Sequence, residues 1–229
     1  MNNIFKYTSL YDYAISTGLY SPTQQENDLV NVGNFSVDSD SIINRLKFKQ
    51  PKKSSTICEH CLTHEELTGM KQWGELTRQD HINWGYSDIQ YASTAVIDDD
   101  WPTELTELAN SLGFEEPPLQ KVLKQSPGQM FPLHIDVYQD LRTEHQQQGP
   151  DMTFDPMIRR VFVALNDWQP GHYYQIGNSV WHNWQAGDAV SFRWGVPHST
   201  ANSGKTDRYT LILTGQVQSG SKIWTQLHV

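Results

Sequence analysis

The stretch GHYYQIGNSVWHNWQAGDAVSFRWGVPHSTANSGKTDRYTLIL, residues 171–213, consists of short apolar segments separated by glycines. Glycine adopts the backbone angles that tight turns require, so this punctuation is typical of short strands joined by turns. Ala186-Gly187-Asp188 reads as a tight turn into a strand over residues 189–194. The stretch therefore predicts a mainly β fold, with strand boundaries at Gly171, Gly177, Gly187 and Gly195.

Neighbouring segments extend this β pattern in both directions. Residues 159–165 contain RVFVAL, an apolar and valine-rich run that favours a strand. Further strands are expected over residues 119–125, 133–139, 208–217 and 222–228. A closed jelly roll makes neighbours of strands that are far apart in the sequence, and we expect these strands to form one.

The N-terminal half has weaker patterns and one clear helix. Residues 102–112 carry a single apolar stripe, begin with a proline that suits a first turn and are followed by Gly113. Shorter helices are expected within residues 1–20 and after Thr63, and most of residues 20–60 read as loops with short elements.

A chain of 229 residues is long enough for one elaborated all-β domain, and its 8 Trp, 10 Tyr and 8 Phe allow a large core. We therefore expect a single domain over residues 1–229. Within it, a helical and loop elaboration (1–118) precedes a jelly-roll core (119–229).

Composition excludes several classes of protein. A formal net charge of −9 argues against a generic nucleic-acid-binding surface. No apolar run is long enough to cross a bilayer, and the first residues do not resemble a secretory signal. The only cysteines, Cys58 and Cys61, fit a reducing compartment and lack the second pair that a structural zinc site needs. We expect a cytoplasmic protein without a nucleic-acid or membrane partner; the oligomeric state is not readable.

A set of metal-binding residue types lies within the predicted β region. His134 and Asp136 are two residues apart, so on a strand they share a face. His198 adds a second imidazole that only the fold can bring close. Two histidines and one carboxylate can bind one face of an octahedral Fe(II) and leave positions for O2 and a co-substrate. The HxD tripeptide alone is a weak signal, but with the distal histidine it predicts an iron site without further catalytic residues.

An arginine follows the second histidine by ten residues. Arg208 and Thr210 are again two residues apart and share a strand face. A guanidinium and a hydroxyl together can hold a carboxylate, so these two residues are candidates for binding a dicarboxylic co-substrate.

Residues 119–217, with HID at 134–136, PHS at 197–199 and RYT at 208–210, resemble the Fe(II)/2-oxoglutarate-dependent dioxygenases, whose fold is the double-stranded β-helix. The resemblance implies that His134, Asp136 and His198 bind Fe(II). It implies that Arg208 and Thr210 bind the C5 carboxylate of 2-oxoglutarate, with threonine where the family often has serine. The layout is similar both to prolyl hydroxylases, which keep HxD, and to aspartyl/asparaginyl hydroxylases, which commonly lack the carboxylate ligand.

The resemblance also implies an activity. The protein would hydroxylate a peptidyl Pro or Asp/Asn residue, or a small amino-acid-like substrate, while 2-oxoglutarate is converted to succinate and CO2. Ascorbate would be a supporting reductant. Two alternatives stay open: a cupin-like metal- or sugar-binding protein without oxygenase activity, and a nucleic-acid oxygenase of the same fold, which the acidic charge disfavours.

Two further residues are candidates for the co-substrate site. Arg160 alternates with valines, and if the valines pack outside it points into the cavity, where it would bind the C1 carboxylate or a substrate carboxylate. A salt bridge at the sheet rim is the favoured alternative for Arg160. Tyr138 shares a face with Asp136 and is a candidate hydrogen-bond donor to the co-substrate or an ordinary core residue.

Other polar and aromatic residues near the motif have simpler interpretations. Asn202 either orients a ligand or caps a turn. Trp181, Trp184 and Trp194 are expected in the core, and His145, His172 and His182 on the surface or in loops.

Overall fold

The computed structural model describes residues 15, 21–23, 29–50, 84–86, 90–135, 158–192, 196–218 and 220–221. Several predicted features lie outside these residues. They are most of the helix within residues 1–20, the helix after Thr63, the Cys58–Cys61 pair, His145, Trp194 and the strand over 222–228.

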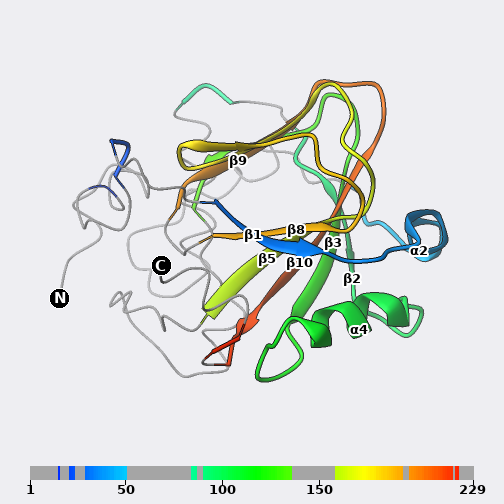
Figure 1. The fold of residues 1–229 in the computed structure, drawn as a ribbon. Helices are drawn as coiled ribbons and strands as arrows, with labels where there is room; N and C mark the ends of the chain where they lie inside the picture. Colours follow the sequence, from blue (N-terminus) through cyan, green and yellow to red (C-terminus); the bar gives the residue numbers. More distant parts are fainter. Residues whose placement is uncertain are drawn as a thin grey trace, which may run out of the picture.

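The described strands form two antiparallel sheets (Figure 1). The larger sheet has the order β1-β8-β5-β10-β3-β2, and the smaller has the order β4-β9-β6-β7. The bounds are β1 Leu29–Asn34, β2 Ser93–Val96, β3 Leu119–Gln125, β4 Met130–His134, β5 Ile158–Ala164, β6 His172–Ile176, β7 Ser179–Trp181, β8 Asp188–Phe192, β9 His198–Asn202 and β10 Arg208–Gln216.

The path of the chain defines the fold. From β3 to β10 it crosses repeatedly between the sheets, so that β3, β5, β8 and β10 lie in one and β4, β6, β7 and β9 in the other. The first and last of these strands, β3 and β10, are hydrogen-bonded neighbours. This is the closed topology of a jelly roll, and the predicted double-stranded β-helix is confirmed.

Both faces of the larger sheet are covered. Strand β5 is buried at every position, because its alternate side chains enter two different cores. Val161 and Val163 pack in an outer core, whereas Phe162 and Ala164 pack in an inner core between the sheets. The inner core also contains Trp181 and Trp184, as the sequence predicts.

Helix α4 (Thr103–Ser111) closes the outer core. Its stripe of Leu105, Leu108 and Ala109 is buried, and Gly113, with φ of +82°, follows its end. In Figure 1 this helix and strand β9 lie on opposite sides of the larger sheet. Helix α2 (Ser39–Arg45) is capped by the side chain of Asp38, which accepts from the Ser41 amide. In the described parts of the chain, no helix is long and apolar enough to cross a membrane.

The predicted strands over 119–125, 159–165, 189–194 and 208–217 agree with β3, β5, β8 and β10 to within one or two residues where they are described. Two strands in the N-terminal half are not predicted from the sequence. Strands β1 and β2 occupy the edges of the larger sheet. Both are short, and β1 contains a register shift between Asn31 and Gly33, which obscures the two-residue alternation.

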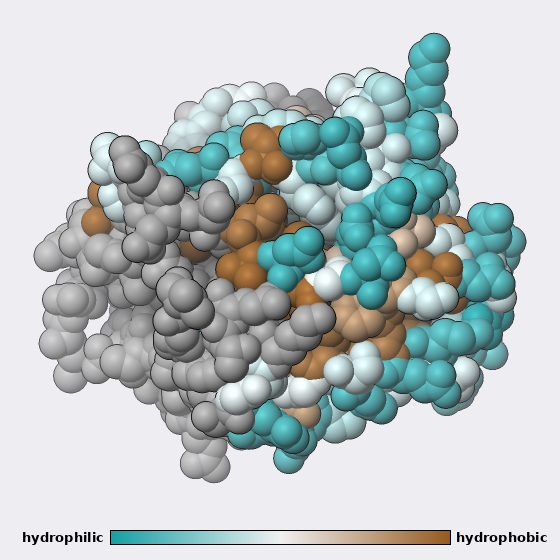
Figure 2. Space-filling view, viewed as in Figure 1, coloured by the Kyte–Doolittle hydropathy of each residue, from teal (hydrophilic) through white to brown (hydrophobic). Residues whose placement is uncertain are grey.

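Edge strand β1 leaves part of its apolar surface accessible. Leu29 and Val30 are half-buried. Figure 2 shows hydrophobic surface in the part of the view where β1 and β8 lie, with hydrophilic side chains beside it.

The turn before β8 requires glycine. Gly187 has φ of +91°, and a Cβ atom there would lie 1.8 Å from the carbonyl oxygen of Phe35. The Phe35 amide donates to the Gly187 carbonyl over 2.9 Å. This close backbone approach ties the segment after β1 to the turn, and it explains the predicted Ala186-Gly187-Asp188 turn.

Candidate metal and co-substrate site

The two candidate metal-binding histidines lie opposite each other in the smaller sheet. His134 at the end of β4 pairs with His198 at the start of β9, and their ring centroids are 4.2 Å apart. A register shift between Phe131 and His134 inserts one extra residue into β4. Without this bulge, residue 133 would face His198, so the bulge decides which side chain points toward it.

Both imidazoles are held in the same tautomer. Nδ1 of His134 lies 2.8 Å from the Pro132 carbonyl, and Nδ1 of His198 lies 3.1 Å from the Val196 carbonyl. A carbonyl only accepts, so each Nδ1 carries the proton, and in the neutral ring Nε2 carries the lone pair. A backbone carbonyl that orients the ring in this way is the usual outer partner of a metal-binding histidine.

Aromatic side chains surround the pair. The Phe192 ring lies 4.9 Å from the His198 ring, and the Phe131 ring lies 5.7 Å from the His134 ring. His198 is 2% exposed. A hydrophobic shell of this kind limits solvent access to a bound metal.

The third candidate ligand, Asp136, and the candidate Tyr138 lie outside the described residues. Among the described residues, no group of three or more His, Cys, Asp or Glu side chains is arranged to hold a metal. The described part of the site therefore supplies two imidazoles that fit Fe(II), and Asp136 remains the predicted third ligand.

Arg208 begins β10 and points between the sheets. Its Nη1 donates to the Tyr173 carbonyl of β6 over 2.8 Å, and its Nη2 donates to Oε1 of Gln125 on β3. Its guanidinium lies over the Tyr174 ring, 4.9 Å from the ring centroid. The side chain therefore bridges the two sheets.

The charge of Arg208 is not balanced by a carboxylate within the described parts of the chain. The side chain is 2% exposed, and its Nε has no hydrogen-bond partner. Burial lowers the pKa of Arg208 to about 10 and the nearby Tyr174 opposes this, so the side chain stays charged at neutral pH. Buried charges are normally paired, so this buried guanidinium with an unused donor is a candidate site for an anionic ligand.

The strands align the candidate anion site with the histidines. Arg208 and Thr210 share the inner face of β10, and Thr210 is buried. On the facing sheet, His198 and Thr200 share the inner face of β9. Because a strand rises about 3.3 Å per residue, His198 and Thr200 are separated by about 7 Å, a span that a five-carbon diacid can cover.

Arg160 lies on the inner face of β5, because the valines of that strand pack in the outer core. It is buried, and its Nε donates to the Thr214 hydroxyl over 2.9 Å. Its backbone pairs with Phe192, the residue whose ring contacts His198. Arg160 therefore lies near His198 in the space between the sheets. On β10 it pairs with Thr214, which is six residues after Arg208.

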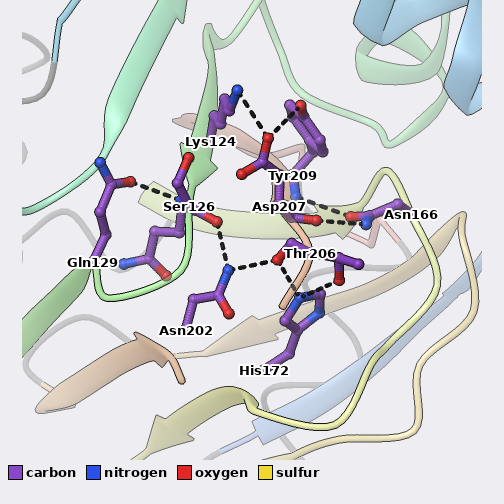
Figure 3. A network of polar contacts seen from close by, with 10 residues as sticks. Lys124, Ser126, Gln129, Asn166, His172, Asn202, Thr206, Asp207 and Tyr209 are labelled. Atoms are coloured by element: carbon purple, nitrogen blue, oxygen red, sulfur yellow. Dashed lines mark hydrogen bonds and ion pairs between the residues drawn. The ribbon is translucent and has the colours of Figure 1, made fainter. Parts of the chain in front are cut away.

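A network of polar groups, some of them buried, holds the turn that carries Arg208 (Figure 3). Asn202 donates to the Gln125 and Thr206 carbonyls over 2.7 Å and 2.8 Å, and its Oδ1 accepts from the Gly204 amide. Asn166 Nδ2 donates to the Asp207 carbonyl over 3.0 Å. Asn202 thus caps the turn, which is one of the two roles expected for it.

The expectation that His172 lies at the surface is wrong. His172 is 4% exposed and stacks on Trp184 with an interplanar angle of 13°. Its Nδ1 accepts from the Gln169 amide, and its Nε2 lies 3.1 Å from the Thr206 carbonyl, to which it donates. Because His172 is buried and both of its nitrogens have hydrogen-bond partners, it helps to hold the turn that precedes β10. His182, in contrast, is exposed as expected.

We expect His172 to make folding sensitive to acid. Burial lowers its pKa from 6.5; the Thr206 hydrogen bond opposes the shift, and nearby Arg208 adds to it. As the pH falls below about 6.5, the unfolded chain takes up a proton that the folded chain does not, so the free energy of unfolding decreases. Urea unfolding of His172→Gln between pH 7.5 and pH 5 should show a smaller decrease than the wild type. His182→Gln is the control, and equal decreases in all three proteins would contradict the prediction.

Sequence reasoning missed Gln125 and Thr200. Thr200 is two residues after His198, and strand periodicity alone could have placed it on the same face. Gln125 contacts Arg208 only through the pairing of β3 with β10, in which the two residues are opposite each other. No local pattern in the sequence signals that contact.

The fold and the two facing histidines define a double-stranded β-helix protein with a candidate metal site between its sheets. Neither family models nor curated protein sequences match the chain. Solved structures with a similar fold include a prolyl-4-hydroxylase from Pseudomonas putida, 19% identical over 56% of this chain and 73% of that chain, with a TM-score of 0.41.

Cupin-type proteins are also among the similar structures. A predicted oxalate decarboxylase from Thermotoga maritima is 16% identical over 55% of this chain and 81% of that one, with a TM-score of 0.33. A cupin 2 conserved barrel domain protein from Salinispora arenicola is 11% identical over 58% and 79%, with a TM-score of 0.32. At these identities the likeness concerns the barrel and does not extend to an activity.

Proposed function

We propose that the protein is an Fe(II)- and 2-oxoglutarate-dependent dioxygenase that hydroxylates its substrate. The observation that carries this proposal is the pairing of two features within one barrel. His134 and His198 face each other in the tautomer that leaves Nε2 as the lone-pair nitrogen. Arg208 is a buried cation without a carboxylate partner among the described residues.

Each part of the proposed site has a defined role. His134, His198 and Asp136 would hold the iron, which supplies O2 activation and the oxidative decarboxylation of 2-oxoglutarate to succinate and CO2. The Pro132 and Val196 carbonyls orient the imidazoles, and the surrounding phenylalanines limit the access of water.

The chain's own cations would position the co-substrate. Arg208 would bind the C5 carboxylate of 2-oxoglutarate, with Thr210 on the same strand face as a second donor. Arg160 and Tyr138 would contact the C1 carboxylate or a carboxylate of the substrate. The burial of Arg160 on the inner face of β5 supports this role over a salt bridge at the solvent-exposed rim.

The substrate that we propose is a peptidyl Pro or Asp/Asn residue or a small amino-acid-like molecule, with ascorbate as a supporting reductant. This choice follows the resemblance of the HxD, distal His and Arg spacing to hydroxylases of those substrates. The site would lie in a protein without a nucleic-acid partner, as the net charge of −9 suggests. A membrane partner is not part of the proposal.

The test combines binding with turnover. Purified protein with Fe(II), ascorbate, O2 and 2-oxoglutarate should form succinate, and more of it when a peptide substrate is present. Binding of 2-oxoglutarate should be measured separately by calorimetry with Mn(II) in place of Fe(II). A protein that binds the metal but neither binds nor consumes 2-oxoglutarate would be a cupin-like metal-binding protein instead.

A further inference from the structure

Gln125 is the residue that connects Arg208 to the facing sheet. It is 0% exposed at the end of β3. Its Oε1 accepts from Nη2 of Arg208, and its Nε2 lies 2.8 Å from Oγ1 of Thr200 on β9. Thr200 is in turn two residues from His198 on the same strand face. Gln125 therefore stands between the candidate anion site and the strand that carries the candidate metal ligand.

The chemistry of these groups fixes the orientation of the Gln125 amide. A guanidinium only donates, so the amide oxygen must face Arg208. A flipped amide would set two donors against each other in a site without water access. With the oxygen facing Arg208, the amide nitrogen lies 2.8 Å from the Thr200 hydroxyl, to which it can donate, and the same hydroxyl lies 3.0 Å from the amide oxygen and can donate to it. This arrangement restrains the guanidinium from one side.

Glutamine satisfies the guanidinium without neutralising it. An amide oxygen accepts the hydrogen bond but carries no net charge, and the Tyr173 carbonyl, which accepts from Nη1 of Arg208, is also neutral. We propose that Gln125 is a positioning residue that holds Arg208 in place and preserves its positive charge for an anionic ligand. The inference rests on the proposed function, in which that ligand is the distal carboxylate of 2-oxoglutarate.

Replacing Gln125 with glutamate separates this role from simple packing. Glutamate has nearly the same shape, and beside the guanidinium its carboxyl stays ionised. The carboxylate accepts from both Arg208 and the Thr200 hydroxyl, so the buried cation gains a counter-ion. Gln125→Glu should therefore melt at a higher temperature than the wild type. The same charge competes with the ligand and should weaken 2-oxoglutarate binding by about 100-fold or more.

Gln120 offers a matched control on the same strand. It is also buried, and its Oε1 accepts from Nε1 of Trp101 over 3.2 Å. Residues 120 and 125 point to opposite faces of β3, so Gln120 faces the outer core and not Arg208. Gln120→Glu buries the same charge without a cation to balance it. It should lower the melting temperature and leave the affinity for 2-oxoglutarate unchanged.

The experiment measures two quantities for the wild type and both variants. Melting temperatures are recorded without metal or ligand, and 2-oxoglutarate dissociation constants are measured by calorimetry with Mn(II). The inference is supported if Gln125→Glu, but not Gln120→Glu, has both a higher melting temperature and a lower affinity for 2-oxoglutarate than the wild type. It is overturned if Gln125→Glu melts as low as Gln120→Glu, or binds 2-oxoglutarate as the wild type does. Failure of the proposed function would be seen differently, as a wild-type protein that does not bind 2-oxoglutarate.

Discussion

Replacing His198 with alanine is expected to abolish metal-dependent activity and to weaken Fe(II) or Mn(II) binding by more than about 100-fold. Losing only an outer partner of a metal ligand already weakens metal binding by about 10- to 100-fold, and losing the ligand itself should cost more. The physical reason is that His198 presents Nε2 from a ring held by the Val196 carbonyl and faces His134 at 4.2 Å between ring centroids. Calorimetric titration with Mn(II), together with succinate formation under Fe(II), measures both effects.

Two further proteins make this result interpretable. His198 is buried, so alanine also leaves a cavity, and His198→Gln retains more of the volume while removing the imidazole. His182→Ala removes an exposed histidine and should bind Mn(II) as the wild type does. If a folded His198→Gln protein bound Mn(II) as tightly as the wild type, His198 would not be a metal ligand.

Replacing Arg208 with methionine is expected to weaken 2-oxoglutarate binding by about 100-fold or more, because the ligand loses charge-assisted hydrogen bonds worth about 1.5–3 kcal/mol each. Mn(II) binding should be unchanged, since the contacts of Arg208 in the described residues are to Tyr173, Gln125 and Tyr174 and not to the candidate metal ligands. The folded state loses two hydrogen bonds but no longer buries a charged side chain, so we expect only a small change in melting temperature. Calorimetry with 2-oxoglutarate and Mn(II), and thermal unfolding, test these effects.

Lys124 supplies the control for Arg208. It pairs with Asp207 over 2.8 Å, next to Arg208 in the sequence but on the outer face of the sheet. Lys124→Met removes a cation from the same region and should not change the affinity for 2-oxoglutarate. Equal losses in Lys124→Met and Arg208→Met would mean that general electrostatics, and not a specific contact, binds the ligand.

The parts of the fold with strong local patterns could be predicted from the sequence. Strand β3 and helix α4 have the expected positions because their periodicity and their boundary residues are local properties. Strands β1 and β2 were missed because they are short edge strands whose stability comes from pairing with β8 and β3. Burial of His172 was missed for the same reason, since its partners Thr206 and Trp184 come from other segments.

For the candidate site, the sequence by itself determined which residue types are available and which of them share a strand face. It thus paired Arg208 with Thr210 and His134 with Asp136. Only the tertiary structure decided that the bulge in β4 turns His134 toward His198, and that Gln125 accepts from Arg208. The physical reason is that contacts along one strand follow from backbone geometry, whereas contacts between strands depend on register and sheet order, which the packing of the whole barrel selects.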